Sequence, residues 1–249
     1  MQQHFDGVTY ALGSAESEAR MADVRPLPIF SEEAVAFLTA FSARILADAE
    51  AKAYPDVVTL GFWCRPAALR QMQKLYDAER NRLGRGIVFH IAPSNVAVNF
   101  AYSCLAAFLA GNASIVRLPS KDFPQVDVFC RIFTETLADF SALFPYFLFV
   151  RYGHVQEVNE HYSRMCQTRV VWGGDATIGA IRRTVLPPRA NEITFADRHS
   201  LAVIDASVYL TAGDKERIAQ DFYNDTYLSD QNACTAPRFV VWLGTAGKV

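Results

Sequence analysis

The cysteine at position 234 is the residue of this chain best suited to covalent chemistry. It lies in the segment Asp230–Arg238, where its neighbours are polar or small. A thiolate attacks thioesters and carbonyls, whereas a free cysteine in apolar helical surroundings, such as Cys104 or Cys130, is usually an inert packing residue. The residues around Cys234 alone leave both a catalytic and a structural role open.

A polar turn at Ile91–Asn95 is the second candidate. It stands between a short apolar run rich in β-branched residues and an apolar run with helical spacing. Backbone N–H groups and the amide of Asn95 at such a place can hold an oxyanion. The alternative is that Asn95 caps the following helix, because asparagine is a favoured N-cap residue.

Two further turns follow strand-like runs. Ser120 and Lys121 offer a hydroxyl and an ammonium that can meet ribose or phosphate oxygens, although a solvated turn has the same composition. The segment Gly173–Gly179 is a glycine turn that enters a helix, where glycine permits close backbone approach to a phosphate. It does not match the GxGxxG pattern, so a plain tight turn is equally compatible with it.

The elements that must position these residues alternate along the chain. Helical patterns cover residues 31–51, 66–82, 96–110 and 126–143, and strand-like runs cover 86–91, 113–118, 146–152 and 169–172. The first helix has a capping serine at Ser31. Alternation of this kind predicts an α/β fold with a parallel sheet, whose usual ligand is a nucleotide at the carboxyl ends of the strands.

The composition restricts the class of protein. With 249 residues, 51% of them hydrophobic and 20% charged, the chain is a folded globular protein. The net charge of −2 argues against nucleic acid or an anionic membrane as a partner. Five cysteines without a CxxC pair indicate no disulfide framework and no zinc site. The first residues lack the pattern of a secretory signal, so none is expected. The apolar region 96–109 is too short to span a bilayer, and we expect a cytoplasmic protein.

Taken in order, the candidate segments resemble successive motifs of the aldehyde dehydrogenase superfamily. The matching segments are Ile91–Asn95, Leu109–Asn112, Val116–Ser120, Trp172–Gly179 and Gln231–Cys234. Within that superfamily, Phe89–Val96, Leu109–Ser120 and Asp230–Arg238 are most similar to the acyl-CoA reductase family, typified by the fatty-acid reductase component of bacterial luminescence. The resemblance covers roughly residues 80 to 245.

The resemblance implies an aldehyde-dehydrogenase-like organisation. Residues 1–200 would form a Rossmann-type NAD(P)-binding domain with an N-terminal helical segment, and residues 201–249 the start of an α/β catalytic domain. Val249 lies fifteen residues after Cys234, shortly beyond a strand-like run at 239–243. Because members of the family continue with a domain-sized remainder, the chain is expected to be C-terminally truncated.

The resemblance also implies a role for each candidate residue. Cys234 would be the nucleophile, and Asn95 with the Cys234 backbone N–H would form the oxyanion hole. No metal is implied. The residues expected at the cofactor are Pro93, Ser94, Ser120, Lys121, Gly174 and Gly179.

Two positions depart from the ordinary superfamily pattern. Thr194 stands where aldehyde dehydrogenases have a glutamate that activates water, so hydrolysis should be poor and thioester exchange favoured. Lys121 stands where a glutamate often binds the ribose, and a cation there favours NADPH, with NADH still open.

Together these features predict NADPH-dependent reduction of an acyl-CoA or acyl-carrier thioester to an aldehyde. Oxidation of aldehydes to acids and a non-catalytic, nucleotide-binding role for a truncated chain remain the alternatives. Association into a homo-oligomer or with other enzymes of acyl metabolism is also left open.

Overall fold

The computed structural model describes residues 7–76, 81–93, 95–227 and 230–244. The chain divides into two compact units, Met1–Phe195 and Ala196–Val249, and each is considered by itself. From sequence we placed this boundary at residue 200. No helix in the described part of the chain has both the length and the apolar character needed to cross a membrane.

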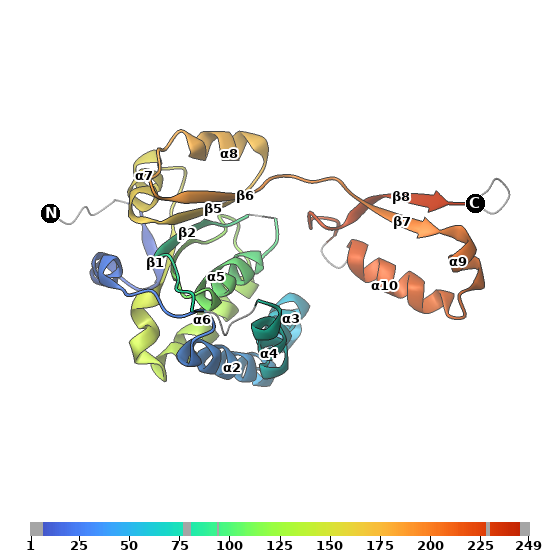
Figure 1. Ribbon diagram of the computed structural model, residues 1–249, viewed down its shortest axis with the longest axis horizontal. Coiled ribbons are helices and arrows are strands. Elements are labelled where there is room, and N and C mark those ends of the chain that lie inside the picture. Colours follow the sequence, from blue (N-terminus) through green and yellow to red (C-terminus); the bar gives the residue numbers. More distant parts are fainter. Residues whose placement is uncertain (1–6, 77–80, 94, 228–229, 245–249) are drawn as a thin grey trace. The chain divides into compact units, whose positions relative to one another are not determined.

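The first unit is built on a six-stranded sheet with the strand order β1-β4-β3-β2-β5-β6. Strands β2 to β6 run parallel, and β1 pairs antiparallel with β4 at one edge (Figure 1). The strands are β1 (Thr9–Leu12), β2 (Ile87–Ile91), β3 (Ala113–Arg117), β4 (Phe147–Arg151), β5 (Thr168–Trp172) and β6 (Asn191–Phe195). The α/β prediction with a mainly parallel sheet is therefore confirmed.

Helices cover both faces of this sheet (Figure 1). One face carries α2 (Glu32–Ala47), α5 (Asn99–Leu109) and α6 (Pro124–Ala138), and α3 (Pro55–Trp63) and α4 (Pro66–Leu75) pack against α2. The other face carries α7 (Gln156–Met165) and α8 (Asp175–Arg182). Shorter elements are α1 (Ala15–Arg20) and the 3-10 turns Met21–Asp23, Ala51–Ala53 and Ser141–Tyr146.

A cluster of phenylalanines fills the core beneath α2. Phe37 on α2 packs edge-to-face on Phe133 of α6 at 5.1 Å between ring centroids. Phe133 in turn packs on Phe147 of β4 at 4.8 Å, and all three are fully or almost fully buried. Each large ring that leaves water contributes about 1.5–3 kcal/mol to stability. The cluster therefore fixes α2 and α6 on the sheet.

Helix boundaries differ from the predicted ones for all four predicted helices. The helix predicted over 31–51 ends at Ala47, and a 3-10 turn follows at Ala51–Ala53. The predicted helix over 66–82 ends at Leu75, and part of the remainder lies outside the described residues. The helix predicted from Val96 begins at Asn99. The helix predicted over 126–143 ends at Ala138 and is followed by a separate 3-10 turn, Ser141–Tyr146, which contains Pro145.

The motif Leu109–Asn112 has a structural role in this fold. Gly111 has φ +83°, and a Cβ there would collide with the backbone carbonyl of Leu27. The Asn112 side chain accepts hydrogen bonds from the backbone N–H of Arg85 at 2.6 Å and donates to the carbonyl of Ala107 at 3.0 Å. The motif therefore ties the end of α5 to the start of β2.

The N-terminal strand and helix are held by one carboxylate. Glu18 of α1 is only 8% exposed and accepts hydrogen bonds from the hydroxyls of Tyr10 at 2.9 Å and Tyr162 at 3.0 Å. Nε2 of His161 lies 2.8 Å from its other oxygen. Burial acts to raise the pKa of Glu18, but the hydrogen bonds from His161 and the two tyrosines outweigh it, so the pKa is lowered.

The second unit is small and buries little apolar surface. It contains β7 (Ser200–Asp205), α9 (Ala206–Thr211), α10 (Lys215–Tyr227) and β8 (Pro237–Leu243), with β7 and β8 paired in parallel. The strand predicted at 239–243 is part of β8. Among the described residues of this unit, Ala206, Thr226 and Ala236 are the buried ones.

Candidate functional site

The strand order of the first unit reverses between β2 and β5. From β2 the chain moves outward to β3 and β4, and it then returns to place β5 and β6 on the opposite side of β2. Open parallel sheets bind their ligands outside the carboxyl ends of the strands at such a reversal. The segments that leave β2, β3 and β5 at this edge hold Pro93, Asn95, Ser120, Lys121 and Gly174.

The turn after β2 does not cap α5. That helix begins at Asn99 with Val98 as its N-cap, so the capping role considered for Asn95 is wrong. Asn95 is exposed and Pro93 half-buried. Ser94, the third predicted residue of this turn, lies outside the described residues.

The loop after β3 presents Ser120 and Lys121 to solvent. Arg151 donates to the carbonyl of Pro119 at 3.2 Å, which fixes the residue before them. The Lys121 ammonium lies 5.0 Å from the ring centroid of Phe123, within the range of a cation–π contact. The next helix starts at Pro124 without a side-chain cap. This loop therefore offers an exposed hydroxyl and an exposed cation near each other in the chain.

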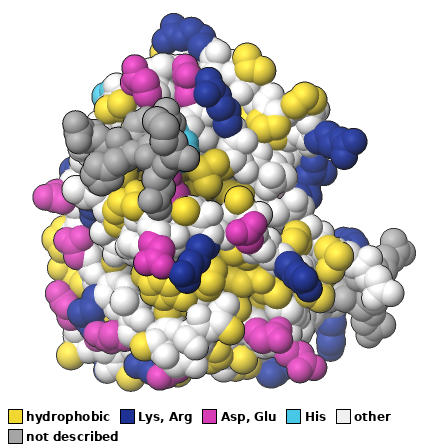
Figure 2. Space-filling model, turned by 90° about the vertical axis from the view of Figure 1, so that its left-hand side faces the viewer, with side chains coloured by type: hydrophobic (Ala, Val, Ile, Leu, Met, Phe, Trp, Pro, Cys, Tyr) yellow, Lys and Arg dark blue, Asp and Glu magenta, His cyan; other side chains and the backbone are white. Residues whose placement is uncertain are grey.

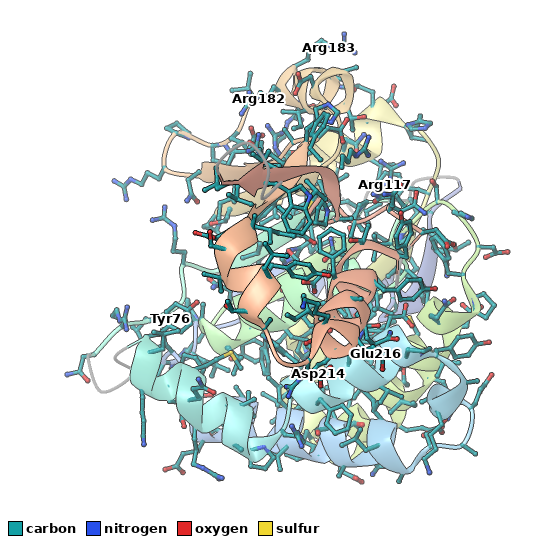
Figure 3. The ribbon with its side chains drawn as sticks, turned by 90° about the vertical axis from the view of Figure 1, so that its right-hand side faces the viewer. Tyr76, Arg117, Arg182, Arg183, Asp214 and Glu216 are labelled. Atoms are coloured by element: carbon teal, nitrogen blue, oxygen red, sulfur yellow. The ribbon has the colours of Figure 1, made fainter. Side chains whose placement is uncertain are left out.

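A second arginine secures the neighbouring loop. Arg117 at the end of β3 donates to the carbonyl of Gly153 at 2.9 Å, and its guanidinium lies 4.6 Å from the ring centroid of Tyr152 (Arg117 is labelled in Figure 3). The Arg117 guanidinium therefore bonds backbone carbonyls of the loop after β4. The Arg117 guanidinium is thus engaged within the chain, whereas Lys121 is exposed.

The turn after β5 carries an unusual aromatic pair. Trp172 stacks on Phe195 at the end of β6, with ring centroids 3.8 Å apart and an interplanar angle of 11°. The indole nitrogen of Trp172 is buried and finds no hydrogen-bond partner among the residues that the structure describes. A buried donor without a partner costs about 1–3 kcal/mol. Next to it, Gly173 donates to the carbonyl of Phe195 at 3.1 Å, and Gly174 is the N-cap of α8.

Gly179 lies inside α8, beyond the Gly173–Gly174 turn with which the sequence grouped it. The helix starts directly after Gly174. Gly179 is the fifth residue of the helix and therefore lies away from the glycine turn. A Cβ built on Gly179 meets nothing within 4 Å. Packing within the described chain therefore does not require glycine at this position.

Alanine at position 179 should therefore separate protein stability from ligand contact. We expect Gly179→Ala to stabilise the chain by about 0.5–1 kcal/mol, because glycine is a poor helix residue, and to raise Tm by a few degrees. If Gly179 lies beside the cofactor, the same change should weaken NADPH binding several-fold. Calorimetry and NADPH titration measure the two effects. Gly213→Ala, at a glycine of the second unit that is also unobstructed, is the matched control and should leave binding unchanged.

Thr194, the residue that the resemblance aligns with the superfamily's glutamate, is the fourth of the five residues of β6. The nearest carboxylate on this strand, Glu192, is held by the buried Arg169 at 2.6 Å and by Arg182 at 2.7 Å (Arg182 is labelled in Figure 3). Burial acts to raise the pKa of Glu192, but the bonds from the two arginines outweigh it and lower the pKa. Glu192 is thus committed to ion pairs, and β6 offers no spare carboxylate as a base. No motif or spacing in the sequence indicates this cluster of Arg169, Arg182 and Glu192.

Cys234 lies in the second unit on a β-turn. The N–H of Ala236 donates to the carbonyl of Ala233 at 3.0 Å, which leaves Cys234 and Thr235 as the central residues. The hydroxyl of Ser200, the first residue of β7, donates to the carbonyl of Cys234 at 2.7 Å. The sequence gives no sign of this contact, because no local pattern links the Ser200 hydroxyl to a backbone carbonyl 34 residues away.

The five cysteines differ in accessibility. Cys234 is exposed, Cys130 is half-buried, and Cys64, Cys104 and Cys166 are buried. Burial raises the pKa of Cys64, Cys104 and Cys130 to about 12 and that of Cys166 to about 11. These four thiols are therefore uncharged near neutral pH. Only Cys234 combines exposure with a polar turn.

The described residues form neither a metal-binding cluster nor, on the face shown in Figure 2, a surface of one charge. Within the described ranges, no three histidine, cysteine, aspartate or glutamate residues are grouped so as to hold a metal ion. On the face shown in Figure 2, basic and acidic side chains are interspersed with apolar ones. The chemistry that the described residues offer is thus nucleophilic attack by an exposed thiol, together with hydrogen bonding at the carboxyl edge of the sheet.

Comparison with known proteins gives a family and a fold. A family model described as acyl-CoA reductase (LuxC) matches residues 16–249. A putative aldehyde dehydrogenase from Burkholderia cenocepacia has a TM-score of 0.65 at 17% identity, covering 91% of this chain and 52% of its own. PnpE from Pseudomonas sp. WBC-3 has a TM-score of 0.66 at 17% identity, with 91% and 50% covered.

A third similar structure is an NAD-dependent benzaldehyde dehydrogenase from Corynebacterium glutamicum, with a TM-score of 0.65 at 15% identity and coverage of 97% and 61%. These structures share the aldehyde dehydrogenase fold with the chain, which spans about half of the length of the first two. No curated protein sequence matches it.

Proposed function

Because the chain belongs to the acyl-CoA reductase (LuxC) family, we propose that it reduces a fatty acyl thioester to an aldehyde through an acyl-enzyme on Cys234. The observation that carries the proposal is the exposed thiol of Cys234 on a hydrogen-bonded turn, while the other four thiols are buried or half-buried. In this proposal the unit Met1–Phe195 binds the cofactor, and the unit Ala196–Val249 carries the nucleophile.

The first chemical step is thioester exchange. The Cys234 thiolate attacks the carbonyl carbon of the acyl thioester, and a new carbon–sulfur bond forms. The amide of Asn95 and the backbone N–H of Cys234 donate hydrogen bonds to the oxygen that becomes negative. The bond to the CoA sulfur then breaks, and CoA leaves as a thiol after taking up a proton. The acyl group remains on Cys234.

The carboxyl edge of the first unit fits a nicotinamide cofactor. The orphaned indole N–H of Trp172 needs an oxygen acceptor, and a dinucleotide offers several. In this proposal Pro93 and Ser94, the exposed Ser120 and Lys121, and the glycines Gly174 and Gly179 supply the remaining contacts. When bound, the cofactor supplies the hydride that reduces the acyl-enzyme.

The fate of the acyl-enzyme depends on the missing base. Thr194 cannot activate water as a carboxylate does, and Glu192 on the same strand is held by two arginines. The acyl-enzyme should therefore persist until it is reduced. Incubation with acyl-CoA and NADPH should yield aldehyde and free CoA, which mass spectrometry would detect. Free fatty acid as the main product would favour hydrolysis, and conversion of added aldehyde to acid would favour the oxidising alternative.

Cofactor choice rests on one side chain. An ammonium at Lys121 can pair with the 2′-phosphate of NADPH, a contact of about 1.5–3 kcal/mol that NADH cannot make. We expect Lys121→Glu to weaken NADPH binding roughly ten- to a hundredfold and to leave NADH binding equal or better. Fluorescence titration of both cofactors measures the ratio, and Lys74→Glu on α4 is the control. An unchanged ratio would remove the reason for preferring NADPH.

A further inference from the structure

The turn that carries Cys234 is fixed from both sides along the chain. Before it, Asp230 and Gln231 have φ of +49° and +58°, in the left-handed region that costs a residue with a side chain roughly 1–2 kcal/mol. The N–H of Asp230 donates to the carbonyl of Tyr227, the last residue of α10, at 2.9 Å. After the turn, Ala236 is 2% exposed and β8 begins at once. Strained backbone of this kind persists only where its surroundings hold it.

A side chain completes the attachment of the turn to β7. Strand pairing places Ser200 beside Pro237, and the register shifts directly after Ser200. Proline has no N–H, so it cannot donate a backbone bond at the first position of β8. The hydroxyl of Ser200 reaches past it and donates to the carbonyl of Cys234 at 2.7 Å. A hydroxyl thus makes the bond between β7 and the Cys234 peptide.

We propose that Ser200 is a positioning residue for Cys234: its hydroxyl holds the Cys234 peptide in the orientation from which the thiol attacks. This inference rests on the proposed role of Cys234 as the nucleophile. The Cys234 backbone N–H and side chain are attached to the same α-carbon as the carbonyl that Ser200 holds. A shift of this α-carbon after loss of the Ser200 bond would therefore move both the attacking atom and an oxyanion donor, and small misplacements of reacting groups slow a reaction strongly.

Orientation can be separated from the intrinsic reactivity of the thiol. An acyl-CoA must meet Cys234 in one geometry, together with the oxyanion donors. Iodoacetamide is small and can approach an exposed thiol from many directions. Loss of orientation should slow acylation much more than alkylation, whereas loss of folding or of thiolate should slow both reactions alike.

The test compares Ser200→Ala with Ser200→Thr and with Ser207→Ala, a serine on α9 of the same unit. Single-turnover acylation of Cys234 by radiolabelled acyl-CoA, alkylation of Cys234 by iodoacetamide and Tm are measured for each. We expect Cys234 of the Ser200→Ala variant to be acylated about five- to tenfold more slowly than in the wild type at saturating acyl-CoA. Its rate of alkylation by iodoacetamide should stay within about twofold of the wild-type rate. Ser200→Thr keeps the hydroxyl and should restore acylation, and Ser207→Ala should match wild type.

Two outcomes would overturn the role of Ser200. One is acylation of Ser200→Ala at the wild-type rate, and the other is an equal loss of acylation and alkylation. Failure of the proposed function looks different, because the wild-type protein would then not be acylated at Cys234 at all.

Discussion

Cys234→Ala is expected to abolish acylation of the protein by radiolabelled acyl-CoA. The reason is that Cys234 is the exposed thiol, while burial raises the pKa of the four others to about 11 or 12 and keeps them uncharged. Cys234→Ser should be nearly as inactive, because a serine hydroxyl is a far weaker nucleophile at neutral pH. Label retained on the chain after denaturing electrophoresis measures the effect.

The half-buried Cys130 provides the matched control. Cys130→Ala removes the next most accessible thiol and should leave acylation unchanged. Brief treatment of the folded wild-type chain with iodoacetamide should modify Cys234 first and block acylation, with the buried thiols reacting only after denaturation. Labelling that survives Cys234→Ala would show that another residue is the nucleophile.

Asn95→Ala is expected to slow acylation and turnover by about a hundredfold or more, because it removes a donor to the oxyanion of the tetrahedral intermediate. The structure adds that Asn95 has no capping role in α5. Val98, not Asn95, is the N-cap of α5. The substitution should therefore not lower the free energy of unfolding by the roughly 1 kcal/mol that loss of a helix cap costs. Single-turnover kinetics and Tm are measured on the same preparation.

Two further measurements make the Asn95 result specific. Asn95→Asp keeps the size of the side chain but replaces the amide donor with a negative charge, so it should be at least as slow as Asn95→Ala. Affinity for NADPH should change little in both variants. A fall in Tm with normal turnover would instead assign Asn95 to the stability of its own turn.

The sequence predicted the parallel strands β2 to β5, because their apolar, β-branched runs are local signals. It did not predict the parallel strands β6 and β7, in which half-buried and exposed residues alternate. Strands β2 and β3 differ from the predicted runs by one residue at an end. The ends of helices and strands were harder to predict, because they depend on the turns and contacts around them. The helix expected from Val96 starts three residues later at Asn99, after a turn that the hydrophobic pattern does not reveal.

The features that the sequence did not predict are held by contacts between distant residues. Strand β1 and helix α1 are short, and they dock through Glu18, whose partners His161 and Tyr162 are more than 140 residues away. The ion pair of Arg169 with Glu192 joins two strands, and the bond from Ser200 to Cys234 joins a side chain to a backbone carbonyl. No local pattern specifies such pairs. The candidate site was therefore found by motif resemblance, and its supporting contacts only by structure.

The phenylalanine cluster has a consequence for how the chain folds during synthesis. Phe37 packs on Phe133 and lies 5.8 Å from Phe147, 110 residues later in the chain. At a synthesis rate of about 5–20 residues per second, the ribosome needs about 5–20 s to make that stretch. During this interval the core face of α2, with Phe37 and Phe41, has no β4 to cover it. We therefore expect this apolar face to stay exposed in the nascent chain until β4 is available to pack on it.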